Sequence, residues 1–98
     1  MTNSPKLSVV VACVNCAATI RACIAAPGLT SEGLETEIIV VDSSADETAA
    51  IAAEVAPHVR ILRNPPGALV PVLWAQGIAA ARGDVVALTT GNFQVGPG

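Results

Sequence analysis

The sequence has few aromatic and few charged residues. Its 98 residues include one Trp, one Phe and no Tyr, and only 13% are charged. The five basic residues are scattered, which argues against a nucleic-acid partner because such binding surfaces cluster Lys and Arg. No apolar run approaches the roughly 20 residues that a membrane-spanning helix needs. We therefore expect a soluble cytoplasmic domain with no nucleic-acid partner and no membrane span.

Cysteine is also scarce, and its three residues do not form the even, closely spaced set of a disulfide scaffold. Cys13 and Cys16 form a C-x-x-C motif between a predicted strand and a predicted helix, a placement typical of thiol-redox sites. Both lie in apolar segments, however, and buried cysteine commonly packs as a small hydrophobic residue. We favour buried, reduced thiols and keep a thiol-redox domain using Cys13 and Cys16 as an alternative.

Glycine is absent from residues 13–18, the first predicted strand-to-helix turn. A Rossmann dinucleotide site needs glycine there, because the backbone must closely approach the pyrophosphate. The acid Asp42 does end the second strand, as an acid does in that class. The missing glycines nevertheless exclude a Rossmann dinucleotide site.

Short β-branched runs alternate with segments of helical periodicity. The sequence predicts strands over 7–14, 37–42, 59–62 and 84–90, and helices over 16–26, from 44 to 56, and over about 68–82. Strands that alternate with helices pair in parallel. The predicted fold class is therefore α/β, an open, mainly parallel sheet of about four strands with three helices.

Several residues carry local predictions. Ser44 and Glu47 have the spacing of a helix capping box, and Gly83 is expected just beyond the end of the third helix. One side of the third helix is lined by Trp74, Gly77, Ile78 and Ala81, and Trp74 should point into the core with Ile78. His58 has no acid or nucleophile placed near it by the sequence, so we expect an edge or surface histidine.

Three stretches resemble family 2 glycosyltransferases of the GT-A type. Residues 8–15, SVVVACVN, match the opening strand of that family, which usually reads S-V-V-I-P-x-Y-N. Residues 37–48 match E-I-I-V-V-D followed by D-x-T, and residues 77–87 match the G-x-x-x-A-x-G-[DE] join that leads to the metal-binding acids. The order and spacing of the three agree over most of the chain.

The resemblance implies a nucleotide-diphosphate-sugar donor bound across the carboxyl ends of the strands. It places the donor nucleotide beside Asp42, Ala12, Val14 and Asn15, with the Asp42 carboxylate accepting hydrogen bonds from the base or ribose. From the residues alone, Asp42 could instead cap the following helix or begin a turn. Residues 1–90 would form the N-terminal, nucleotide-sugar-binding part of the domain, and residues 91–98 a loose tail.

The resemblance also implies a divalent metal, Mg²⁺ or Mn²⁺, held by a D-x-D motif. Here those positions are occupied by Thr90 and Asn92, which are neutral, whereas such a cation bound to a pyrophosphate prefers carboxylate oxygens. The sequence therefore predicts no metal-binding and no catalytic residue in this chain.

The function expected from the resemblance is sugar transfer from a nucleotide-sugar donor. This chain would be truncated before the acceptor and catalytic half and inactive alone. The alternative is a non-catalytic binding or interaction fragment. Its last strand, 84–90, would then be an exposed edge through which the chain could self-associate.

Overall fold

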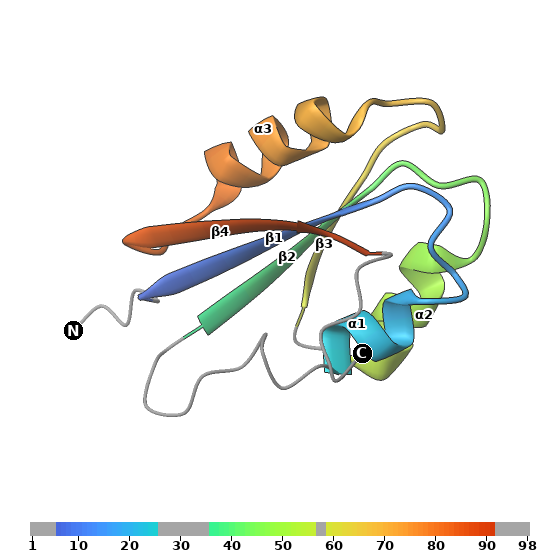
Figure 1. Ribbon diagram of the computed structural model, residues 1–98, viewed down its shortest axis with the longest axis horizontal. Helices are drawn as coiled ribbons and strands as arrows, with labels where there is room; N and C mark the ends of the chain where they lie inside the picture. The colour runs from blue at the N-terminus through green and yellow to red at the C-terminus, as the bar shows by residue number, and fades with distance from the viewer. Residues whose placement is uncertain (1–5, 26–35, 57–58, 92–98) are drawn as a thin grey trace, which may run out of the picture.

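A computed structural model describes residues 6–25, 36–56 and 59–91 of the chain (Figure 1). In chain order its elements are β1 (Leu7–Cys13), α1 (Ile20–Ala25), β2 (Thr36–Asp42), α2 (Thr48–Val55), β3 (Arg60–Arg63), α3 (Val70–Ala80) and β4 (Val85–Thr90). His58, Asn92 and the rest of the predicted tail after Gly91 lie outside the described residues.

The four strands form one parallel sheet in the order β3-β2-β1-β4. The predicted α/β fold class is confirmed. The chain moves outward from β1 through β2 to β3, and then α3 carries it back to β4 on the other side of β1. The winding direction therefore reverses between β1 and β4, and in open α/β sheets ligands bind at the carboxyl ends of the strands beside such a reversal.

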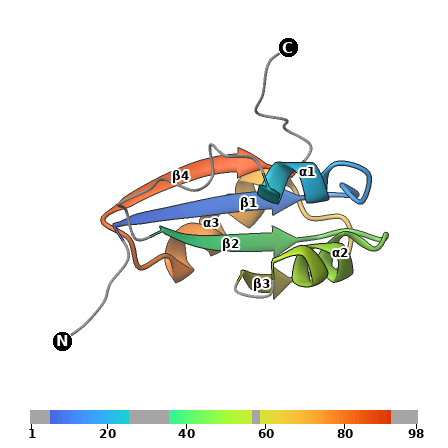
Figure 2. The same ribbon diagram turned by 90° about the horizontal axis from the view of Figure 1, so that it is seen from below.

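Helices cover both faces of the sheet. Figure 1 shows α3 on one face and α1 and α2 on the other, and Figure 2 shows α1 and α2 near the carboxyl ends of the strands. The side chains of β1 alternate between the two layers: Val9, Val11 and Cys13 pack with α1 and α2, whereas Val10 and Ala12 pack with α3. This two-sided burial explains why the strand is almost continuously apolar.

The first two helices begin later than the sequence predicts. The chain turns at residues 17–19, and α1 starts at Ile20 rather than at Cys16. The predicted capping box is also wrong, because the N-cap residue of α2 is Glu47 and its side chain makes no capping hydrogen bond. Instead, the Asp46 carboxylate accepts a hydrogen bond from the Thr48 backbone N–H, and Ser44 is used elsewhere.

The third helix meets the sheet with most of its predicted side, but Ile78 lies outside the contact. Leu73 and Gly77 are its buried residues, Trp74 is half-buried, and Ile78 is 48% exposed. Gly77 lies against Val10, where any Cβ would overlap the valine side chain. The small residue thus sets which face of α3 meets the sheet.

Gly83 does not end α3 in the expected left-handed conformation, since the helix stops at Ala80 and Ala81 is extended. Gly83 is required for another reason. A Cβ on this residue would lie 2.7 Å from both the backbone nitrogen and the hydroxyl of Ser8. Its lack of a side chain lets the turn before β4 approach the start of β1.

A polar network at the amino ends of the strands fixes this turn. Glu37 Oε2 accepts hydrogen bonds from the Ser8 hydroxyl and the Arg82 backbone N–H, both at 2.6 Å. Its Oε1 accepts from Arg60 Nη1 at 3.2 Å, and the Gly83 N–H donates to the Ser8 hydroxyl at 2.8 Å. Both oxygens of this carboxylate are therefore in use.

The environment of Glu37 changes its acidity. Burial is the largest single influence and raises the pKa of Glu37. The hydrogen bonds from Ser8, Arg82 and Arg60, together with the charge of Arg60, outweigh burial and leave the pKa lowered. The network therefore stabilises the ionised form of the carboxylate.

Candidate functional site

The carboxyl ends of β1 and β2 are joined by a hydrogen-bonded relay that ends at Asp42. The Asn15 backbone N–H donates to the Ser44 hydroxyl at 2.8 Å, and that hydroxyl donates to Asp42 Oδ1 at 2.6 Å. Asn15 has a φ of 54°, a left-handed conformation that asparagine tolerates better than most residues. Its side-chain oxygen accepts from the Ala45 N–H at 2.8 Å. The segment after β1 is thereby fastened over the segment after β2.

A second relay runs parallel to the first and ends at Asp46. The Cys16 N–H donates to the Thr48 hydroxyl at 2.9 Å, which donates in turn to an oxygen of Asp46. The other oxygen of Asp46 accepts from the Ala17 N–H at 3.1 Å. The Thr48 hydrogen bond is the main cause of the lowered pKa of Asp46. Both oxygens of Asp46 thus have partners.

Asp42 differs from Asp46 in its burial and in the hydrogen bonding of its carboxylate oxygens. Its side chain is 1% exposed, and Oδ2 has no hydrogen-bond partner among the described residues. A buried carboxylate oxygen without a partner is costly and is uncommon in folded proteins. Asp42 therefore has an unused hydrogen-bond acceptor on the same carboxylate that accepts from Ser44.

The structure brings together only some of the predicted donor-binding residues. Asn15 and Asp42 are linked through Ser44. Ala12 lies in the core beneath α3, on the opposite face of the sheet, and is 1% exposed. Val14 is 38% exposed beside Asn15. Asn15, Asp42 and Val14 thus meet at one edge, whereas the Ala12 side chain does not reach it.

The loops on either side of this edge are also tied together. The Ser43 hydroxyl donates to the Pro65 carbonyl at 2.8 Å and accepts from the Ala68 N–H at 2.9 Å. The Asn64 N–H donates to the Asp42 carbonyl at 2.8 Å. Ser43 and Asp42 therefore connect the segment after β2 to the turn before α3.

The point of reversed winding is closely packed. Gly91 follows β4, is buried, and donates its N–H to the Ala12 carbonyl at 2.9 Å. A Cβ there would lie 2.7 Å from Cys13 Sγ and 3.2 Å from Cys16 Cβ. The Thr19 hydroxyl donates to the Gly91 carbonyl at 2.9 Å. These contacts fill the space between the ends of β1 and β4.

The residues at this end of β4 do not suit the metal that the family resemblance implies. Thr90, at the first position of the D-x-D motif, carries a hydroxyl, and Gly91 carries no side chain. The described ranges contain no group of three or more His, Cys, Asp or Glu residues able to hold a metal ion. Mg²⁺ and Mn²⁺ bound to phosphates require carboxylates that these positions lack.

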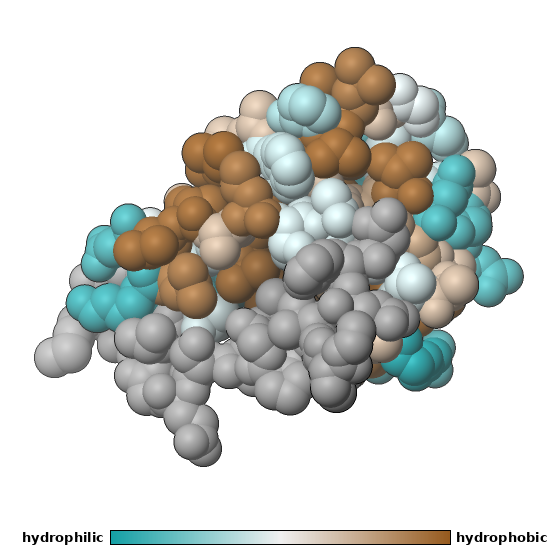
Figure 3. Space-filling view, viewed as in Figure 1, coloured by the Kyte–Doolittle hydropathy of each residue, from teal (hydrophilic) through white to brown (hydrophobic). Residues whose placement is uncertain are grey.

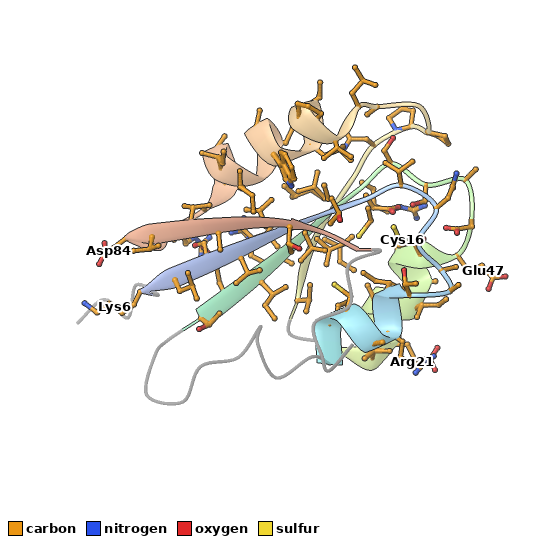
Figure 4. All side chains as sticks on the ribbon, in the orientation of Figure 1. Lys6, Cys16, Arg21, Glu47 and Asp84 are labelled. Carbon is orange, nitrogen blue, oxygen red and sulfur yellow. The ribbon has the colours of Figure 1, made fainter. Side chains whose placement is uncertain are left out.

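The three cysteines are free and buried, as we favoured. Cys13, Cys16 and Cys23 belong to the core layer beneath α1 and α2. Burial is the main cause that raises the pKa of each thiol, and for Cys13 the neighbouring Cys16 and Asp42 raise it further. In Figure 4, Cys16 lies inside the molecule, whereas Arg21 and Glu47 point outward. Raised pKa values suppress the thiolate that redox chemistry requires.

Sequence reasoning missed the roles of Ser44, Asp46 and Thr48. The signal was present, because residues 46–48 carry the D-x-T pattern that we quoted for the resemblance. We interpreted Ser44 as a helix cap since capping acts within a few residues. The observed partners lie about 30 positions earlier in the chain, and a local pattern cannot reveal them.

Comparison with known proteins agrees with this architecture. The family model described as Glycosyl transferase family 2 matches residues 8–97. The chain belongs to glycosyl transferase family 2, and its parallel sheet is consistent with the GT-A type.

One relative is described as the uncharacterized protein MT1568 of Mycobacterium tuberculosis (strain CDC 1551 / Oshkosh). It is 38% identical to this chain over 96 residues. The match covers 96% of the chain but only 30% of the relative. The chain therefore spans about a third of the length of that protein. None of the helices in the described residues is long and apolar enough to cross a membrane.

Proposed function

We propose that this chain binds the nucleoside diphosphate part of a nucleotide-sugar donor at the carboxyl ends of β1 and β2. The observation that carries the proposal is the unpartnered, buried Oδ2 of Asp42. A carboxylate oxygen accepts hydrogen bonds from a ring N–H of a base or from a ribose hydroxyl. Membership of the glycosyltransferase family supports this ligand class.

Binding requires a local rearrangement. Asp42 is 1% exposed, so a base reaches Oδ2 only when the segment containing Val14 and Asn15 moves away from Ser44. This segment is held mainly by the hydrogen bonds to residues 44–48, and both Val14 and Asn15 are exposed. Opening it separates few apolar contacts, which is typical of ligand-binding segments.

We further propose that these 98 residues bind the donor but do not transfer the sugar. Thr90 cannot supply the charge that would stabilise the departing diphosphate. The alternative is a non-catalytic binding or interaction fragment that pairs with another chain through the edge strand β4. Three free thiols suit a reducing compartment, and we include a cytoplasmic location in the proposal.

Calorimetric titration of the chain with UDP and with GDP, each with and without Mn²⁺, tests the proposal. We expect one of the two nucleotides to bind, with little dependence on Mn²⁺ because acidic ligands are lacking at residue 90. Failure of both nucleotides to bind would contradict nucleotide recognition. Detection of sugar transfer by the isolated chain would contradict the non-catalytic part.

A further inference from the structure

One basic residue lies at the carboxyl end of a strand. The basic residues of the chain are Lys6, Arg21, Arg60, Arg63 and Arg82. Two of them form ion pairs with acids near the amino ends of the strands. Arg21 belongs to α1 and points outward in Figure 4. Arg63 is the last residue of β3, so it lies at the same edge of the sheet as Asp42, the last residue of β2.

The backbone holds Arg63 in place beside Asp42. The two residues are paired in register across the parallel strands β2 and β3. Directly after Arg63, the Asn64 N–H donates to the Asp42 carbonyl at 2.8 Å. The Asn64 side chain also exchanges two hydrogen bonds with Gln76 of α3, at 2.8 and 2.9 Å. The position of Arg63 relative to Asp42 is therefore fixed by contacts on both sides.

The side chains of Arg63 and Asp42 belong to the same face of the sheet. In β3, Ile61 packs with the layer of α1 and α2, whereas Leu62 packs with α3. Side chains alternate along a strand, so Arg63 projects on the side of Ile61. Asp42 projects on that side too, because it lies two residues after Val40, which packs in the layer of α1 and α2.

The Arg63 guanidinium is available to a ligand. Its residue is exposed, and no hydrogen bond or ion pair joins its side chain to any residue that the structure describes. A guanidinium donates parallel, paired hydrogen bonds to phosphate oxygens, which makes arginine a preferred residue for binding phosphate. A free cation thus stands next to the carboxylate that carries the proposed nucleotide site.

The diphosphate of the proposed ligand requires a positive charge. Thr90 and Gly91 offer no carboxylate with which to hold a metal ion. The elements α3 and β4 carry no charged residue, and Figure 3 shows hydrophobic residues gathered over this side of the molecule. Asp42 and Asp46 add negative charge near the ends of β1 and β2. A basic side chain at this edge is the remaining source of the charge.

We propose that Arg63 binds the diphosphate of the nucleotide, in the role that a metal ion would otherwise fill. This inference rests on the proposed nucleotide site. Asp42 Oδ2 then accepts a hydrogen bond from the nucleoside, and Arg63 donates hydrogen bonds to the phosphates. The neighbouring ends of β2 and β3 thus recognise the two chemically different parts of one ligand.

Calorimetric titration of the full chain and of the variant R63Q tests this role. The ligands are UDP and GDP, together with uridine and guanosine, which lack the diphosphate. R63Q should bind the preferred nucleotide at least about tenfold more weakly, because a charge-assisted contact is lost, and should bind the matching nucleoside as tightly as the original chain does. Equal nucleotide affinities of R63Q and the original chain would overturn the role of Arg63. An equal loss for nucleoside and nucleotide would overturn the contact with the diphosphate.

Two further variants separate a specific contact from a general effect of charge. R82Q removes the same charge from an exposed arginine before β4 and should bind the nucleotide like the original chain. R63K keeps the charge without the planar guanidinium, and it should bind more tightly than R63Q and more weakly than the original chain. Equal losses of affinity in R63Q and R82Q would contradict a specific contact.

The salt dependence of binding gives a second readout. Added NaCl screens the attraction between an exposed guanidinium and a phosphate. It should therefore weaken nucleotide binding by the original chain more than nucleotide binding by R63Q. The same salt dependence in both would overturn the inference.

Failure of this inference can be told apart from failure of the proposed function. If the original chain binds neither nucleotide nor nucleoside, the nucleotide site is wrong and the role of Arg63 falls with it. If the original chain binds the nucleotide and R63Q binds it equally tightly, only the role of Arg63 is wrong.

Discussion

The two ends of β2 each hold an acid, partly exposed at Glu37 and buried at Asp42, and the hydrogen bonds of the two acids differ. Glu37, near the amino end, has hydrogen-bond donors on both carboxylate oxygens, from Ser8, Arg60 and Arg82. Asp42, at the carboxyl end, has one oxygen bonded to Ser44 and one without a partner among the described residues. A fully satisfied acid fixes the fold, whereas a half-satisfied acid retains the capacity to bind a ligand.

The largest effects on stability are expected from two glycines that flank β4, one near the amino ends of the strands and one near their carboxyl ends. Gly83→Ala would bring a Cβ within 2.7 Å of the Ser8 backbone nitrogen, which cannot move without displacing β1. Gly91→Ala would meet mainly the side-chain atom Cys13 Sγ, at the same distance. We expect G83A to cost about 3 kcal/mol and G91A about 1 kcal/mol of unfolding free energy, measured by urea denaturation. A larger cost for G91A would show that the carboxyl end is the more rigid one.

Substitution of Glu37 should have the next largest effect. In Glu37→Gln the amide oxygen can still accept from Ser8 and Arg82, but the amide NH₂ then faces the guanidinium of Arg60. We expect a loss of about 2 kcal/mol of unfolding free energy, again from urea denaturation. The isoelectronic control Glu54→Gln, on the exposed surface of α2, should change stability little. Equal stabilities of E37Q and E54Q would contradict the structural role of the network.

The pH dependence of stability offers a smaller effect with a defined sign. The pKa of Glu37 is lower in the folded chain than in the unfolded chain. Its stabilisation is therefore complete above the unfolded value of about 4.3 and is lost as the pH falls through the lower, folded value. The stability difference between the original chain and E37Q should shrink below that pH. A difference that grows on acidification would have the wrong sign.

The fold could be predicted from the sequence because strand and helix periodicities repeat locally along this chain. The parallel sheet follows from alternating elements, and the buried cysteines follow from their apolar neighbours. The side of α3 predicted to face the core is largely correct, since Gly77 is buried and Trp74 packs against the core, whereas Ile78 is exposed and Leu73 is buried in its place. Periodicity alone favoured Trp74 and Ile78 as core residues.

The candidate site was harder to predict than the fold. The position of Asp42 at the end of a strand could be inferred, and so could its proximity to Asn15. The relays through Ser44 and Thr48 could not, because they join residues that are distant in the sequence. The burial of Asp42, which is 1% exposed, could not be predicted from the sequence either.

A paired measurement on D42N and E37Q tests the central distinction most directly. Unfolding free energy and UDP or GDP affinity are measured for both variants, with E54Q as the control. D42N should lose at least about tenfold in nucleotide affinity, because the acceptor is replaced, and should keep its stability within about 1 kcal/mol. E37Q should lose stability and keep its affinity. If D42N binds the nucleotide as tightly as the original chain, or if it unfolds while E37Q is unaffected, the roles assigned to the two ends of β2 are wrong.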